Sequence, residues 1–147
     1  MNNIESTTRK LEISCDPSRL DFDEIFLYLS EQSYWAKGIP AEVVKRSIKN
    51  SLCFGAYIDG RQIAFARVIT DYATFGYLAD VFVVTKYRGQ GIAGELMKNI
   101  MAHSKLQQLR RILLVTRDAH SLYANYGFEP IPQDNKMMQF HRPEIYS

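Results

Sequence analysis

The first fifty residues combine one strand pattern with two helix patterns. Polar and apolar residues alternate over 10–14, which predicts a half-buried strand, and the turn residues Asp16-Pro17-Ser18 end it. Apolar residues then recur at helical spacing, which predicts two helices that each bury one side. Their apolar positions are Phe22, Ile25, Phe26 and Leu29 in the first helix, and Val43, Val44 and Ile48 in the second, which begins at Pro40.

The middle of the chain has the pattern of paired strands. Segments 52–58 and 62–69 are apolar and flank Asp59-Gly60, a dipeptide that tolerates positive φ and closes tight antiparallel hairpins. Segment 77–84 is rich in β-branched and aromatic residues and predicts another strand.

The next part has the pattern of a strand, a helix and a second strand. Apolar residues at helical spacing predict a helix over 91–104, and the apolar run 112–115 predicts a buried strand after it. A helical connection normally joins parallel neighbours, so we expect 77–84 and 111–116 to pair in parallel.

The last thirty residues predict one short helix and one strand. Asp118 is a suitable cap for a helix that ends at Tyr126, and Gly127 can adopt the left-handed conformation that follows a helix. Segment 137–141 predicts a final strand. The order of elements is therefore that of a mixed α/β (α+β) domain.

Length and composition agree with a soluble globular domain. The chain has 147 residues, 46% of them hydrophobic and 23% charged, which fits one domain over 1–147 with a flexible segment at 1–9. The net charge of +2 does not favour a nucleic-acid partner.

Localisation and metal binding follow from what the sequence lacks. Its longest apolar stretches, such as 81–84, are too short to span a membrane, and 1–10 has no apolar core of a secretory signal, so we expect a cytoplasmic protein. Cys15 and Cys53 have no metal-ligand spacing, which predicts reduced thiols and no metal site.

A glycine-rich loop carries the clearest chemical signal. Arg88-Gly89-Gln90-Gly91-Ile92-Ala93-Gly94 joins the strand 77–84 to the next helix. Glycines leave backbone N–H groups uncovered, the helix start adds unpaired N–H groups, and Arg88 adds a cation, so the loop suits a diphosphate. The alternative is a glycine-rich turn that only permits a tight connection.

Two other nucleotide motifs fit the loop less well. Gly89, Gly91 and Gly94 match the G-x-G-x-x-G fingerprint, but 85–88 separates them from the strand and 105–113 contains no acidic residue for a ribose. A Walker phosphate loop requires a lysine followed by Ser or Thr, which is absent here.

Two motifs together resemble one family. Arg88-x-x-Gly91-x-Ala93 before a helix, followed by Leu122-Tyr123-x-x-x-Gly127-Phe128 after the next strand, is similar to the GNAT superfamily of acetyl-CoA-dependent N-acetyltransferases. The resemblance implies a central twisted mixed sheet, mostly antiparallel and split near Val83, with helices on both faces.

The resemblance also implies a site for acetyl-CoA as cosubstrate. The loop would hold the pyrophosphate, pantetheine would lie along the preceding strand, and the amide of Val83 would polarise the thioester carbonyl. The expected cofactor-binding residues are Val81, Phe82, Val83, Arg88, Gly89, Gln90, Gly91, Ile92, Ala93 and Gly94. Tyr123 would protonate the departing thiolate; the alternative is a helix residue that only packs beside Phe128.

The general base and the acceptor site have several candidates. Asp80, beside the expected transfer point, is the best-placed catalytic carboxylate, and the alternative is a structural carboxylate that pairs with Arg67 or caps a bulge. The family's frequent catalytic glutamate falls near Tyr77 here, and His120 is a weaker candidate. The expected substrate-binding residues are Tyr34 and Trp35, with core packing as the alternative.

These observations predict an enzyme that moves an acetyl group from acetyl-CoA to a primary amine of a small molecule by direct transfer in a ternary complex. Asp71 and Asp80 would attract a cationic acceptor. The alternatives are a non-catalytic coenzyme A or nucleotide sensor, a protein or peptide N-acetyltransferase, and a nucleic-acid-binding module. We expect no nucleic-acid or membrane partner and leave a homodimer open.

Overall fold

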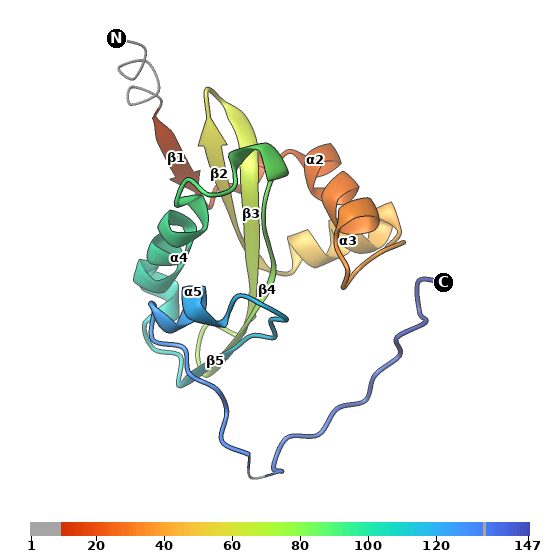
Figure 1. The fold of residues 1–147 in the computed structure, drawn as a ribbon, viewed down its shortest axis with the longest axis vertical. Coiled ribbons are helices and arrows are strands. Elements are labelled where there is room, and N and C mark those ends of the chain that lie inside the picture. Colours follow the sequence, from red (N-terminus) through yellow and green to blue (C-terminus); the bar gives the residue numbers. More distant parts are fainter. Residues whose placement is uncertain (1–9, 134) are drawn as a thin grey trace.

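The described strands form one mixed sheet. The computed structural model describes residues 10–133 and 135–147, and the segment 1–9, predicted to be flexible, lies outside them. The strands are β1 (Leu11–Ser14), β2 (Leu52–Ile58), β3 (Arg61–Thr70), β4 (Phe75–Val83) and β5 (Arg111–Leu113). They lie in the order β1-β2-β3-β4-β5, antiparallel except for the parallel pair β4–β5 (Figure 1).

Helices cover both faces of this sheet, as predicted. The longer ones are α2 (Phe22–Leu27), α3 (Ala41–Lys49), α4 (Ile92–Ala102) and α5 (His120–Ala124). Single turns are η1 (Pro17–Arg19), η3 (Thr85–Tyr87) and η4 (Ser104–Leu106), and the wide π turn η2 (Tyr28–Gln32) prolongs α2. Figure 1 shows α2 and α3 on one side of the sheet and α4 on the other.

Each face has its own apolar core. On the α4 face, Leu96 and Met97 are fully buried against strand residues such as Ala66 and Val68. On the other face, Ile25 and Val44 of the first two helices pack with Phe65 and Phe82. The spacing that predicted the helices thus identifies the sides they bury.

The predicted hairpin is confirmed. Asp59 and Gly60 have φ values of 52° and 76°, and Ile58 pairs with Arg61 across the turn. Two consecutive residues at positive φ are typical of the turn whose twist matches that of paired strands.

β4 contains a bulge next to the expected transfer point. Phe65 of β3 lies opposite Phe82, but Arg67 lies opposite Ala79, so β4 has one residue more than its partner over this stretch. Asp80, within the bulge, has φ of 56°. A bulge bends the strand and increases its local twist, so β4 changes direction here.

The sheet splits soon after β5 begins. β4 and β5 pair only from Phe75 to Tyr77 and from Arg111 to Leu113, a shorter parallel pair than the sequence predicted. The split therefore begins at Tyr77, and β4 is already separated from β5 when it reaches Val83.

Two expectations for the carboxyl-terminal part are wrong. Segment 137–141 is described but is not a strand and pairs with none of the described strands, and its residues Met138 and Phe140 are 95% and 83% exposed. Asp118 does not cap the short helix either. The cap position of α5 is Ala119, no side chain caps the helix, and the Ala119 N–H donates to Thr116 Oγ1 at 3.0 Å.

Among the described helices, none has both the length and the apolar character needed to cross a membrane.

Candidate functional site

The glycine loop opens backbone groups at the start of α4. Gly89 and Gly91 have φ values of 78° and 79°, and no described atom lies within 4 Å of the position that a Cβ would take on either. Glu95 N donates to Gly91 O at 3.1 Å, so the N–H groups of the preceding helical residues have no acceptor within the helix. This arrangement fits an anion such as a phosphate.

Gly94 has a different role from the other two glycines. It lies inside α4, and a Cβ there would come within 3.0 Å of the Tyr126 hydroxyl. Gly94 therefore allows the segment after α5 to pack closely on α4. Sequence reasoning placed it among the cofactor-binding residues and missed this contact.

Arg88 ties the loop to the end of β4. Its Nε donates to the Val83 carbonyl at 3.0 Å and one terminal nitrogen donates to the Tyr28 hydroxyl at 2.8 Å. The Tyr28 ring stacks on Phe82 with 3.9 Å between centroids. Arg88 is exposed, so the cation stands at the surface where the loop opens.

The backbone of Val83 faces away from β3. Val84 N donates to Ile63 O at 2.8 Å, and backbone groups of successive residues in an antiparallel pair point alternately toward and away from the partner. Val83 therefore directs its N–H and carbonyl to the other edge, as its hydrogen bond from Arg88 indicates. That edge of β4 is the one left open by the split.

Asp80 is held by two donors. Trp35 Nε1 donates to Oδ1 at 2.7 Å, and Arg67 Nε pairs with Oδ2 at 2.5 Å. Arg67 also donates to Ser51 Oγ at 3.0 Å, and the exposed fractions of the Arg67 and Asp80 side chains are 15% and 9%. The pair with Arg67, considered above as a structural alternative, is present; whether Asp80 also accepts a proton from substrate stays a prediction.

Tyr34 and Trp35 form an open aromatic wall. Their rings meet edge to face at 5.0 Å, and the residues are 52% and 40% exposed, so core packing alone does not account for them. The guanidinium of Arg117 lies 3.9 Å from the centroid of Tyr34, within the range of a cation–π contact.

Tyr123 is buried beside this wall. It is 8% exposed, its ring meets Phe128 edge to face at 6.0 Å, and Gly127, with φ of 92°, returns the chain so that Phe128 N reaches Tyr123 O at 3.2 Å. Burial, with a smaller effect from Tyr34, raises the pKa of Tyr123 above its ordinary value. The phenol therefore keeps its proton to higher pH than an exposed tyrosine does.

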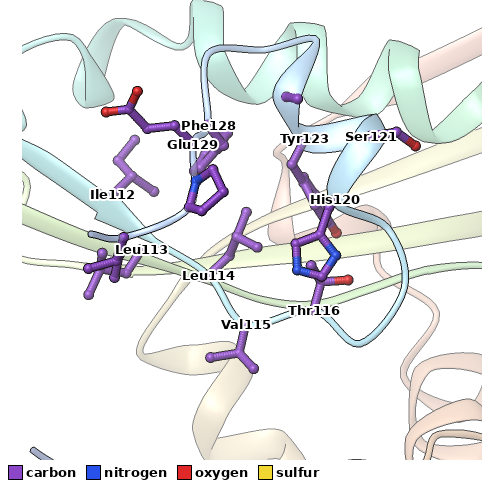
Figure 2. A pocket seen from close by; sticks show the side chains of 13 residues that line it. Ile112, Leu113, Leu114, Val115, Thr116, His120, Ser121, Tyr123, Phe128 and Glu129 are labelled. Carbon is purple, nitrogen blue, oxygen red and sulfur yellow. The ribbon is translucent and has the colours of Figure 1, made fainter. Parts of the chain in front are cut away.

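A pocket runs along β5 next to Tyr123. It has a volume of about 560 Å³ and lies between Leu114 and Val115 on one side and Phe128 on the other, with His120 at its rim (Figure 2). His120 is exposed.

Asp71 is far from these residues. It precedes β4, whereas Val83 ends it, and its carboxylate accepts hydrogen bonds from the N–H groups of Ala73, Thr74 and Phe75. These bonds, with that of the Thr74 hydroxyl, hold the pKa of Asp71 well below its usual range. Asp71 therefore stabilises a turn.

The described residues contain no group of three or more His, Cys, Asp or Glu side chains able to hold a metal ion.

Comparisons with known proteins agree with this geometry. Residues 49–130 match the family model described as an acetyltransferase (GNAT) domain. A Gibberella zeae protein described as an acetyltransferase (FG08082) is 33% identical over 140 residues, covering 80% of this chain and 78% of that protein.

Solved structures give the same result. A protein from Xanthomonas campestris pv. campestris, described as an acetyltransferase of the GNAT family, is 51% identical with a TM-score of 0.91, covering 94% of this chain and 97% of that one. An acetyltransferase from Clostridium acetobutylicum, solved with acetyl-CoA, is 18% identical with a TM-score of 0.62, covering 91% and 96%. With a family model over more than half of its length and two relatives above 30% identity, the chain belongs to the GNAT acetyltransferase family.

Proposed function

We propose that the protein transfers an acetyl group from acetyl-CoA to a primary amine of a small molecule, by direct attack in a ternary complex. The observation that carries the proposal is the combination of an open glycine loop at the start of α4, a free edge of β4 beside it, and the buried Tyr123 in the apolar cluster against which Val83 packs.

The loop and the strand edge fit acetyl-CoA. Gly89 and Gly91 leave room for a diphosphate against the helix start, and exposed Arg88 supplies a positive charge. Pantetheine is an extended chain with amide groups, so the free backbone edge from Val81 to Val83 can bind it by hydrogen bonds. The related Clostridium acetobutylicum protein holds acetyl-CoA, which supports the same cosubstrate here.

Different residues beside the end of β4 contribute to different steps of the acetyl transfer. The amine nitrogen forms a bond to the thioester carbonyl carbon, and the bond from that carbon to sulfur breaks. The Val83 N–H stabilises negative charge on the carbonyl oxygen, and the Tyr123 hydroxyl gives its proton to the departing sulfur. A buried neutral phenol suits that task because it remains protonated until the thiolate develops.

Asp80 accepts the proton of the attacking amine, directly or through water. A carboxylate has about four lone-pair positions, of which the Trp35 and Arg67 bonds use two, so an acceptor position remains. The same two bonds fix the carboxylate within the bulge of β4.

Direct transfer requires no acyl-enzyme on cysteine. Burial raises the pKa of the Cys53 thiol to about 11, so it is neutral at physiological pH and a poor nucleophile. Cys15 directly follows β1, and its sulfur lies 3.6 Å from Nε2 of His103, the residue after α4. Neither residue belongs to β4 or β5, so Cys15 is not part of the site proposed for the transfer.

The acceptor binds at the aromatic wall of Tyr34 and Trp35. Neither carboxylate expected to attract a cation supports that role, because Asp71 caps a turn and Asp80 is paired with Arg67. The wall instead offers exposed aromatic surface next to the Arg117 guanidinium.

A screen of acceptors tests the function as a whole. The protein is incubated with acetyl-CoA and amines, polyamines, amino acids, aminoglycosides or peptides, and free thiol is followed. We expect turnover with a small primary amine. Turnover with peptides or proteins only would contradict the small-molecule acceptor, and coenzyme A binding without any turnover would indicate a sensor.

Replacing Arg88 tests the cosubstrate site. Arg88→Ala removes the cation at the loop, so we expect the KM for acetyl-CoA to rise about tenfold or more while kcat changes less. Lys86→Ala is the matched control, because Lys86 is an exposed cation two residues earlier that contacts the Tyr87 ring. An equal effect of both variants would mean that only net charge matters.

Replacing Tyr123 tests the proton donor. Tyr123→Phe keeps the packing with Phe128 and removes the hydroxyl, so we expect kcat to fall by about 10² or more with little change in acetyl-CoA affinity. Because burial raises the pKa of Tyr123, the basic limb of the wild-type kcat profile should lie above the pH at which an exposed tyrosine ionises. Tyr126→Phe is the control, and unchanged kcat in Tyr123→Phe would contradict the role.

Replacing Asp80 tests two roles of this residue, the acceptance of the amine proton and the pairing with Arg67. Asp80→Asn leaves the Arg67 charge largely buried without its partner, so we expect unfolding free energy to fall by about 3 kcal/mol in denaturant titrations. We also expect kcat/KM to fall by about 10² or more, because the variant has no carboxylate to accept the proton of the amine. The control is Glu95→Gln, which breaks an exposed pair with Lys98 and should cost less than about 1 kcal/mol. A kcat/KM that is unchanged in Asp80→Asn would contradict the role of Asp80 as the base.

A further inference from the structure

The aromatic wall of Tyr34 and Trp35 continues into a third ring, that of Tyr28. The rings of Tyr28 and Trp35 are tilted by 45° with 6.4 Å between their centroids, and those of Trp35 and Tyr34 meet at 5.0 Å. Trp35 contacts both of the other rings, so it is the middle member of the three. We call these three rings the aromatic row.

A guanidinium lies against each outer ring of the aromatic row. At the end next to the glycine loop, Arg88 donates to the Tyr28 hydroxyl at 2.8 Å. At the other end, Cζ of Arg117 lies 3.9 Å from the centroid of the Tyr34 ring. That distance is the van der Waals separation of two carbon atoms, so the Arg117 guanidinium rests on the ring face. The row therefore has a cation at the cosubstrate end and a second one at the opposite end.

The charge of Arg117 has no matching carboxylate. Among the ion pairs between described residues, none includes Arg117, although Asp118 is next to it in the sequence. Arg117 is exposed, and a guanidinium keeps its positive charge at physiological pH. Its N–H groups lie in the guanidinium plane, so a ring against one face leaves them able to bind an anion with two hydrogen bonds.

Asp80 lies at the middle of the row, between the two cations. Its carboxylate accepts a hydrogen bond from Trp35 Nε1 at 2.7 Å, and its charge is compensated by Arg67. The positive charge on the acceptor side of the row therefore comes from Arg117. An acceptor whose anionic group lies on Arg117 would extend along the rings and bring its amine to Asp80.

The Arg117 end of the row is also close to the proposed proton donor. Tyr34 lies near enough to Tyr123 to contribute to the raised pKa of that phenol. A molecule bound between Arg117 and Asp80 is therefore beside the residue that would protonate the departing thiolate.

The charges on the row discriminate between classes of amine. Polyamines and aminoglycosides carry several ammonium groups, which the Arg117 guanidinium would repel. A molecule with one amine and one anionic group is complementary at both places. The phosphates of acetyl-CoA are expected at the Arg88 end, so the two anions do not compete for one cation.

We propose that the acceptor carries an anionic group, a carboxylate or a phosphate, in addition to its primary amine, and that Arg117 binds this group. The inference rests on the acetyl transfer proposed above and adds the class of acceptor. Tyr34 acts as a positioning residue, because its ring supports the guanidinium.

Matched acceptors test the preference for an anion. Glycine, β-alanine and 4-aminobutanoate are compared with their uncharged amides, and 2-aminoethyl phosphate with ethanolamine. We expect kcat/KM for the best anionic acceptor to exceed that of its uncharged counterpart at least about tenfold. Whether the carboxylates or the phosphate give the larger ratio identifies the anionic group. Equal values for charged and uncharged acceptors would overturn the proposal.

Arg117→Gln tests whether this residue is responsible for the preference. We expect the ratio to fall close to one, while the KM for acetyl-CoA and the turnover of the amides stay the same. Arg46→Gln, at an exposed arginine of α3, is the matched control and should keep the wild-type ratio. Tyr34→Phe retains the ring and should keep the ratio, whereas Tyr34→Leu should lower it. A preference that survives in Arg117→Gln would contradict the assignment.

Fluorescence separates this inference from the acetyl transfer. Trp35 is the single tryptophan of the chain, so its emission reports on the aromatic row without any turnover. The protein is titrated with the same acceptors in the presence of coenzyme A, and we expect the anionic ones to bind with a Kd at least about tenfold lower than their counterparts, except in Arg117→Gln. If anions bind through Arg117 but none is acetylated, the transfer is wrong and the anion site stands. If acetylation and binding are both independent of Arg117, the transfer stands and the anion site is wrong.

Discussion

The buried pair between Arg67 and Asp80 is the interaction on which the site depends. It joins β3 to β4 at the place where β4 has one extra residue, and Asp80 adopts positive φ there. An aspartate tolerates that conformation better than most residues, and its charge is compensated by the arginine opposite. The bulge bends β4, and the second partner of Asp80, Trp35, brings the segment after α2 onto the same point. One carboxylate therefore stabilises both the bulge and the aromatic wall.

Sequence reasoning was most successful where local chemistry decides the structure. Positive φ at Asp59 and Gly60, the apolar side of α4 and the glycine loop before it all follow from residues close in the sequence. The two motifs that identified the family are local as well. Such features can be predicted because the responsible residues act on their own backbone or on the next turn.

The features that were missed or wrong depend on residues far apart in the chain. Gly94 faces Tyr126, and Trp35 reaches Asp80 across 45 positions. Segment 137–141 has a strand pattern, but pattern alone does not supply the neighbour that a strand needs.

The π turn η2 gives the aromatic wall a strict dependence on chain length. It begins at Tyr28, whose ring stacks on Phe82, and ends at Gln32, shortly before the exposed rings of Tyr34 and Trp35. Each residue of an α-helix rotates the chain by about 100°, and a π turn holds one residue more than an α turn. Loss of a single residue here would restore a regular helix and swing the following rings away from Asp80 and Tyr123. Homologues with a regular helix at this point would therefore present a different aromatic surface beside Asp80, even with every residue of the glycine loop unchanged.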